Sequence, residues 1–115
     1  MTDPRPEEVV GPSSGPVLLD IGGRFGGLVL RVPRELDGTE IEIRRPSEPW
    51  TGRHVGVRAR PMAGPDVFAA VFGPLEEGSY ELRRRAAPHD FTRHRVRVVG
   101  GQVADTSWPA RNATR

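Results

Sequence analysis

The stretch VFAAVFGPLEEGSYELRR, residues 67–84, decides the fold class of this chain. A short apolar run is followed by the turn residues Pro-Leu-Glu-Glu-Gly, and Tyr80 and Leu82 then alternate with charged neighbours. Apolar side chains at every second position are typical of a strand with one buried face, and Gly and Pro mark the turn between strands. The stretch therefore predicts two β-strands folded back on each other over one buried face.

The composition of the whole chain is consistent with short strands. Its 115 residues suffice for one domain, and 12 prolines and 14 glycines favour strands and turns over long helices. The absence of cysteine excludes disulfides, thiolate metal sites and a cysteine nucleophile. Every basic residue is an arginine, but the net charge is only +2, so the composition does not indicate a strong electrostatic field.

The two ends of the chain differ from the middle. Residues 1–15 are rich in Pro, Glu, Gly and Ser and predict a disordered N-terminal segment, and residues 109–115 predict a flexible polar tail. The N-terminus lacks the pattern of a signal peptide, and no apolar run is long enough to cross a bilayer. We therefore expect one domain over residues 16–108, in a cytoplasmic protein with no membrane partner and no cofactor.

Strand candidates follow one another closely through this domain. They cover residues 17–21, 28–32, 39–44, 54–60, 67–72, 79–85 and 92–99, with a closing edge strand over 102–108. Residues 67–72 are apolar on both faces, which predicts a central strand with material packed on each side. Seven or eight short strands separated by turns are typical of an all-β, antiparallel β-sandwich, and a small β-barrel is the alternative.

A family resemblance points to the same fold. The pattern over residues 74–82, PLEEGSYEL, resembles the hairpin of prealbumin-like sandwich modules such as Cna-B and carboxypeptidase regulatory-type domains. The segments LLDIGGRFGGLVL, FAAVFGPLEEGSYEL and VRVVGGQVADTSWP are similar to a group of small actinobacterial proteins of unknown function. The resemblance spans most of residues 16–108 and implies a prealbumin-like β-sandwich, but it brings no activity or ligand.

Histidines and an acid form the first candidate site. His54, His89 and His94, with Asp90 beside His89, carry side chains that can bind zinc, copper or iron. Their spacing does not match HExxH or a facial triad. Two readings stay open, a transition-metal site if the three histidines converge and solvent-facing histidines if they do not.

Arginines form the second candidate. Arg83 and Arg85, with Arg58 and Arg60 if their strands are neighbours, would make a basic face for a partner, and the arginines at positions 93, 95 and 97 alternate along one side of a strand. Such a face can contact phosphates, although few aromatic residues are present to stack on bases. The other reading is cross-strand pairing with Glu40, Glu42 and Glu81, the ordinary use of charge on a solvated sheet face.

A third candidate is Phe25, which lies within the glycine-rich loop GGRFGG. Its side chain is placed either to anchor a partner or to fold back over the end of the sandwich.

No serine lies in a G-x-S-x-G elbow, so we expect no enzyme. The sequence predicts a protein-interaction or ligand-binding accessory module, whose unknown protein partner docks on the arginine-bearing face or along an edge strand. The same edge offers a route to a homodimer. Metal binding and weak nucleic-acid binding are the alternatives.

Overall fold

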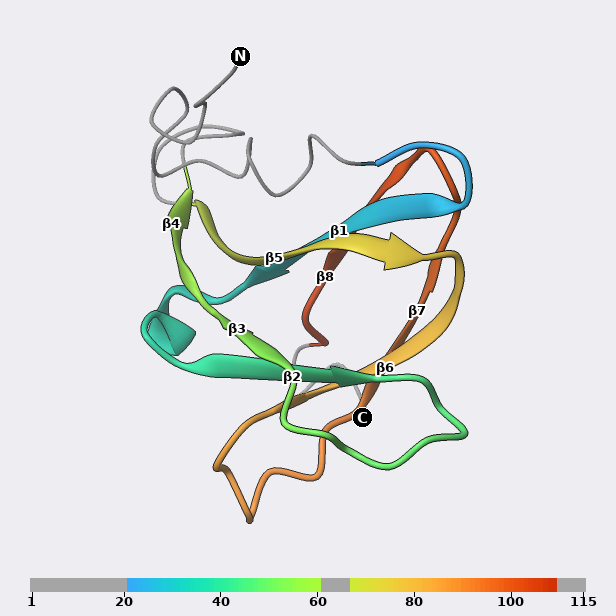
Figure 1. Ribbon diagram of the computed structural model, residues 1–115. Coiled ribbons are helices and arrows are strands. Elements are labelled where there is room, and N and C mark those ends of the chain that lie inside the picture. The colour runs from blue at the N-terminus through green and yellow to red at the C-terminus, as the bar shows by residue number, and fades with distance from the viewer. Residues whose placement is uncertain (1–20, 61–66, 110–115) are drawn as a thin grey trace.

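The computed structural model describes residues 21–60 and 67–109, and within them the chain is all-β (Figure 1). Its elements are β1 (Phe25–Val32), the short 3-10 helix η1 (Arg34–Leu36), β2 (Glu40–Arg44), β3 (His54–Gly56), β4 (Arg58–Arg60), β5 (Val67–Glu76), β6 (Gly78–Arg84), β7 (His94–Val98) and β8 (Val103–Ser107). The N-terminal segment 1–15, most of the strand expected over 17–21 and the tail beyond residue 109 lie outside the described residues.

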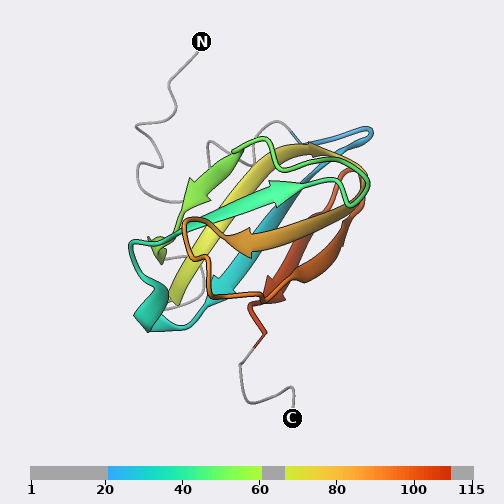
Figure 2. The same cartoon turned by 90° about the horizontal axis from the view of Figure 1, so that it is seen from below.

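The eight strands form two sheets of four. Sheet A has the order β4-β5-β1-β8 and sheet B the order β3-β2-β6-β7. The two sheets lie one over the other in a sandwich-like arrangement (Figure 2) rather than as one closed sheet. The expectation of a fully antiparallel structure is wrong at one place, because β1 and β8 pair in parallel. A tight turn at Gly100 and Gly101 carries the chain from β7 in sheet B into sheet A, so no hairpin requires β8 to oppose its neighbour.

The core lies between the two sheets, and both sheets supply it. The largest fully buried side chains are Phe72, Leu28, Leu30, Ile41, Ile43, Leu75, Leu82 and Val98. The alternation predicted for Tyr80 and Leu82 is confirmed, because both are buried in this core together with Ile41 and Ile43. Each buried side chain of this size contributes about 1.5–3 kcal/mol through the removal of apolar surface from water.

Strand β5 is the central strand that its sequence predicts. It lies between β4 and β1, and both of its faces are buried. Phe68, Ala70 and Phe72 face the core, whereas Ala69 and Val71 join Val29 of β1 in a second buried cluster on the opposite face of sheet A.

The connection between β5 and β6 differs from the predicted hairpin. The two strands do not pair with each other, because β5 belongs to sheet A and β6 to sheet B, and they face each other across the core. The chain crosses between the sheets at Glu77 and Gly78. Gly78 has φ +135°, a conformation that side chains disfavour, and a Cβ atom there would collide with the guanidinium group of Arg45.

The single strand expected over residues 54–60 is also divided between the sheets. The chain bends at the buried Val57, so β3 forms an edge of sheet B and β4 an edge of sheet A. The expectation that Arg60 faces solvent is wrong. Its side chain is only 8% exposed, and its Nε lies 3.5 Å from the carbonyl oxygen of Ala69 in the neighbouring strand β5.

Candidate functional site

The outer face of sheet B carries a set of charged pairs between strands. Each pair joins a glutamate to an arginine that lies on the adjacent strand or directly after that strand. The N–O distances are 2.8 Å for Arg83–Glu42, 2.8 Å for Arg44–Glu81 and 3.0 Å for Arg85–Glu40. The expectation that these three glutamates pair across strands is therefore confirmed. The arginines concerned are already neutralised by partners within the chain, which leaves them little charge to offer a ligand.

A tryptophan packs on top of these pairs. The Trp50 ring, in the loop between β2 and β3, lies 4.3 Å from the guanidinium carbon of Arg44 and 4.1 Å from that of Arg83, with Arg93 at 5.8 Å. Guanidinium groups on an indole face are favourable cation–π contacts. The arrangement leaves Glu42 only 5% exposed although it is an outward residue of a surface sheet. Sequence analysis missed Trp50, because its three arginine partners come from three separate segments.

The arginines of β7 and of the residues just before it differ in their surroundings from those of β2 and β6. Arg93, Arg95 and Arg97 are all exposed, and Arg95 lies directly opposite Glu81 on β6. Glu81, however, accepts hydrogen bonds from both Nε and Nη2 of Arg44, at 3.0 and 2.8 Å. Arg97 lies opposite Ser79, which carries no charge. Three positive charges therefore stand side by side along this margin of the sheet.

None of these three arginines has a carboxylate partner within the described part of the chain. Arg93 donates only to the backbone carbonyls of Asp90 and Thr92, and its guanidinium lies near Trp50. Neither the Arg95 side chain nor the Arg97 side chain forms a hydrogen bond or ion pair with any described residue. We call Arg93, Arg95 and Arg97 the β7 arginine row.

Strand β7 is also an edge strand. It is the last strand of sheet B, and among the described strands it forms its ladder with β6 alone. On its inward side, His94 contacts β8 through a 3.1 Å hydrogen bond between its Nε2 and the hydroxyl of Thr106, and its ring packs edge-on against Trp108. Burial lowers the pKa of His94, because a charged imidazole is poorly solvated there.

The other arginines and Phe25 lie elsewhere. Arg58 is exposed and Arg60 is buried on β4 of sheet A, so the expectation that they join Arg83 and Arg85 in one basic stripe is wrong. The reason is the bend at residue 57, which carries them into the other sheet. Phe25 follows a tight turn closed by two backbone hydrogen bonds with Gly22, and its side chain is 38% exposed.

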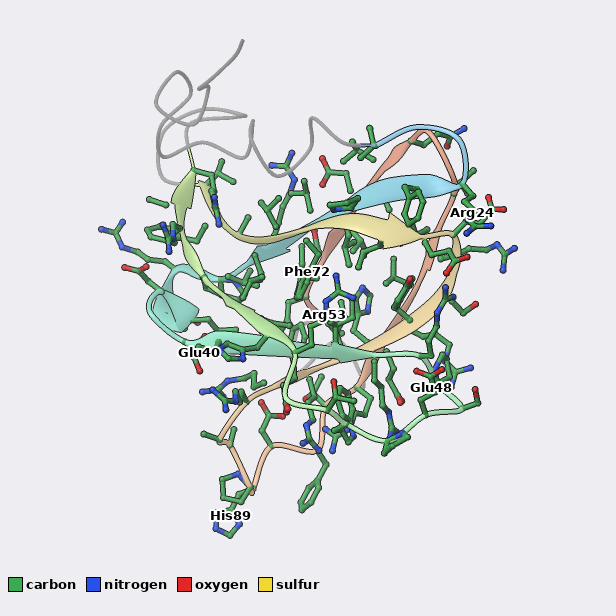
Figure 3. The ribbon with its side chains drawn as sticks, in the orientation of Figure 1. Arg24, Glu40, Glu48, Arg53, Phe72 and His89 are labelled. Carbon is green, nitrogen blue, oxygen red and sulfur yellow. The ribbon has the colours of Figure 1, made fainter. Side chains whose placement is uncertain are left out.

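The three histidines lie at three separate places. His54 is on the β3 edge of sheet B, where its Nε2 is 3.7 Å from Glu40, and His94 is on the opposite edge. His89 lies at the tip of the loop between β6 and β7, away from the sheets (Figure 3). Within residues 21–60 and 67–109, no three His, Asp or Glu side chains come together as a metal site would require. Asp90 is engaged with an arginine instead.

A groove opens where η1, the β6–β7 loop and the end of β8 meet. Its volume is about 900 Å³, and its walls include Leu36, Trp108 and Phe91. Arg84 and Asp90 supply its polar surface and lie 3.2 Å apart.

Asp90 is held in place at this groove. Its Oδ1 accepts a 3.0 Å hydrogen bond from the Thr92 backbone. Burial raises the pKa of Asp90, but hydrogen bonds from Thr92 and from the Arg84 guanidinium outweigh burial and hold the pKa below its usual range. Asp90 is therefore a fixed, ionised partner for Arg84.

Comparisons with models of protein families, with curated proteins and with solved structures return no match to this chain. Among the described residues, no helix has the length and apolar character needed to traverse a bilayer. The candidate site therefore has to be judged on its own geometry.

Proposed function

We propose that this chain is a prealbumin-like β-sandwich that acts as a protein-interaction module, and that it binds an extended acidic segment of a partner protein along β7. The observation that supports this most directly is the β7 arginine row: two exposed arginines on the edge strand and one directly before it, none of them with a carboxylate partner among the described residues, beside outer-face glutamates that are all engaged. The module acts by binding and needs no catalytic group or cofactor.

The spacing of the row matches a neighbouring strand. Arg95 and Arg97 alternate within β7, so their side chains leave the same face about 6.5–7 Å apart, and Arg93 directly precedes the strand. An extended peptide laid beside β7 repeats its own side chains at the same interval. Alternate acidic residues of that peptide therefore meet the row, while the free backbone groups of the edge strand form the ladder.

The same face is less suited to nucleic acid or to self-association. Trp50 is the aromatic residue that packs there, and its ring is in contact with Arg44 and Arg83 rather than open to a base. A second copy paired along β7 would bring two rows of like charge together, which opposes a homodimer through this edge.

A peptide titration tests the proposal. The probe is a labelled eight-residue peptide in which Glu alternates with Thr, and its binding is followed by fluorescence anisotropy at low ionic strength. We expect the double variant Arg95→Glu/Arg97→Glu to bind it at least about tenfold more weakly, because two contacts become repulsive. A matched control, Arg53→Glu/Arg58→Glu, changes the net charge equally at exposed positions outside the row and keeps the affinity within about threefold.

Two further probes show which outcome would overturn the proposal. A peptide of the same composition with its four glutamates in one block keeps the charge and loses the alternation, so it should bind more weakly. Equal binding of both peptides, or an equal loss in the control variant, would show attraction by net charge alone. A single-stranded oligonucleotide that binds more tightly than the alternating peptide would favour the nucleic-acid alternative.

A further inference from the structure

Three apolar side chains are buried on the face of sheet A that points away from the core. Val29 of β1 and Val71 of β5 lie opposite each other and are each 3% exposed, and Ala69 of β5 is 0% exposed. Among the described residues these three form a cluster of their own, separate from the core between the sheets. A sheet face open to water leaves such side chains partly exposed, so this face is covered.

The neighbours of Val71 within sheet A do not account for its burial. Strand β4 pairs with residues 67–69 of β5 and does not reach Val71. Two positions further along each central strand, Gly27 and Gly73 carry no side chain. The Arg31–Asp105 ion pair lies across β1 and β8, away from β5. Because these exposures are those of a single chain, the cover is another part of the same chain.

The turn before β1 directs the preceding residues back along this strand. Gly22 and Phe25 form an antiparallel bridge that is closed by two backbone hydrogen bonds of 2.7 and 2.8 Å. Each step from Gly22 towards the N-terminus therefore matches one step from Phe25 along β1, and residue 18 comes level with Val29. Four residues of extended chain span about 13 Å on either side of the bridge, so the two positions are equally far from it.

These preceding residues have no free edge of β1 on which to continue the bridge as a ladder. From Gly26 onward one edge of β1 pairs with β5, and from Gly27 the other edge pairs with β8. The inner face of sheet A is filled by the core. The outer face is therefore the surface left for a segment that runs back along β1.

Composition separates the two segments that could cover the cluster. Residues 17–19 (VLL) are the longest apolar run outside the described residues, whereas the β4–β5 loop over residues 61–66 has one large apolar side chain, Met62. A loop of this length returns to its neighbouring strand, so it extends at most about 12 Å from the strand ends. Val71 lies about 13 Å along β5 from Val67, where that loop ends. The N-terminal run is the better match in both composition and reach.

We infer that residues 17–20 (VLLD) run along the outer face of sheet A, with their apolar side chains over Val29, Ala69 and Val71. This face is then an internal contact of the chain, and a partner protein meets sheet B instead. The inference shares no residue with the β7 arginine row and does not depend on the acidic-peptide proposal.

Labelling of a single thiol tests this contact, because the chain has no cysteine of its own. Val71→Cys places a thiol of similar size in the cluster, and Arg95→Cys places one at an exposed position. The rate of reaction with N-ethylmaleimide is followed by mass spectrometry of the intact full-length chain. We expect Val71→Cys to react at least about a hundredfold more slowly than Arg95→Cys, because a covered thiol reacts only while its cover is open.

Substitution of the covering residues should remove that protection. In the Val71→Cys background, Leu18→Asp/Leu19→Asp should raise the labelling rate at least about tenfold, because carboxylates are not retained on an apolar face. The matched control is Val9→Asp/Val10→Asp, which changes two adjacent apolar residues earlier in the chain in the same way. It should leave the labelling rate within about twofold of that of Val71→Cys alone.

A second thiol separates local uncovering from unfolding. Val98→Cys lies in the core between the sheets and should stay protected when Leu18→Asp/Leu19→Asp is added. Ala69→Cys repeats the measurement in the same cluster if Val71→Cys does not fold.

Several outcomes would overturn the inference. Labelling of Val71→Cys as fast as that of Arg95→Cys would show an uncovered face. A faster rate in Met62→Asp, with no change in Leu18→Asp/Leu19→Asp, would assign the cover to the β4–β5 loop. Equal acceleration by both double variants, or of Val98→Cys as well, would show a general effect on the fold. Protection that is lost on about hundredfold dilution of the protein would assign the cover to a second copy.

Discussion

The two sheets each have four strands and one face in the core, but they differ on their outer faces. The outer face of sheet A has a buried apolar cluster, Val29, Ala69 and Val71, with the Arg31–Asp105 ion pair beside it. The outer face of sheet B carries charged pairs, Trp50 and the β7 arginine row. The comparison shows that inward residues alone do not define a strand's role. The outward residues distinguish a sheet that is packed on both faces from a sheet whose outer face is open to solvent and to a partner.

The β7 arginine row belongs to sheet B, whereas the groove also has walls from η1 and from the segment that follows β8 of sheet A. The arginine row runs along β7, and Arg84, the polar group of the groove, is the last residue of β6. Sheet A contributes β1 and β5, the two strands with the most buried residues.

The largest expected effect comes from placing the same charge on the outer face of each sheet. Val71→Asp should reduce the free energy of unfolding by more than about 3 kcal/mol, because an unpaired carboxylate is desolvated in sheet A. Arg95→Asp, at an exposed position of sheet B, should change it by less than about 1 kcal/mol. Urea denaturation measures both, and Val71→Thr provides a milder variant if Val71→Asp does not fold. Similar losses for Val71→Asp and Arg95→Asp would remove the distinction between the sheets.

An intermediate effect is expected at the one outward carboxylate of sheet B that is buried. Glu42→Gln should cost about 1–3 kcal/mol, because it leaves the Arg83 guanidinium without its charged acceptor. Asp105→Asn breaks a pair with Arg31 that is much more exposed, so the loss should be smaller. Both are measured by urea denaturation at neutral pH. A larger loss for Asp105→Asn would contradict the burial of the Glu42 pair beneath Trp50.

The smallest effect concerns pH and the contact between the two sheets at His94. Burial lowers the pKa of His94 from its usual value of 6.5, so the unfolded chain takes up a proton that the folded chain does not. Stability should therefore fall as the pH drops from about 7 through that value, and level off below the folded-state pKa. Thermal unfolding between about pH 7 and 5 should show a flatter slope in His94→Gln than in the control His89→Gln. Identical slopes in the two variants would refute a buried, neutral His94.

Local features of the strands were predictable from the sequence. Alternation in EIEIR and in SYELRR identifies the inward residues of β2 and β6, and the apolar run of β5 identifies a strand covered on both faces. Side chains on a strand alternate between its two faces whatever the strand pairs with, so this pattern is readable without knowledge of the neighbours. Pairing of Glu40 and Glu42 with arginines across strands was one of two interpretations of the sequence, and the structure supplied the partners.

The candidate sites were predictable only in part. The arginines at 93, 95 and 97 stood out by their spacing, but their lack of partners depends on Glu81 turning to Arg44 instead of Arg95. Trp50 gave no signal, because its contacts come from segments distant in sequence. The groove residues Leu36, Arg84 and Trp108 are also far apart along the chain, and no local pattern connects them.

By itself, the sequence determined that the chain folds into strands and, for β2, β5 and β6, which side chains enter the core. Only the tertiary structure decided that β5 and β6 lie in different sheets, that residues 54–60 divide between both sheets, and that β8 runs parallel to β1. The physical reason is that alternation and turn preference are set within a few residues, whereas strand pairing depends on how two whole sheets close over a shared core.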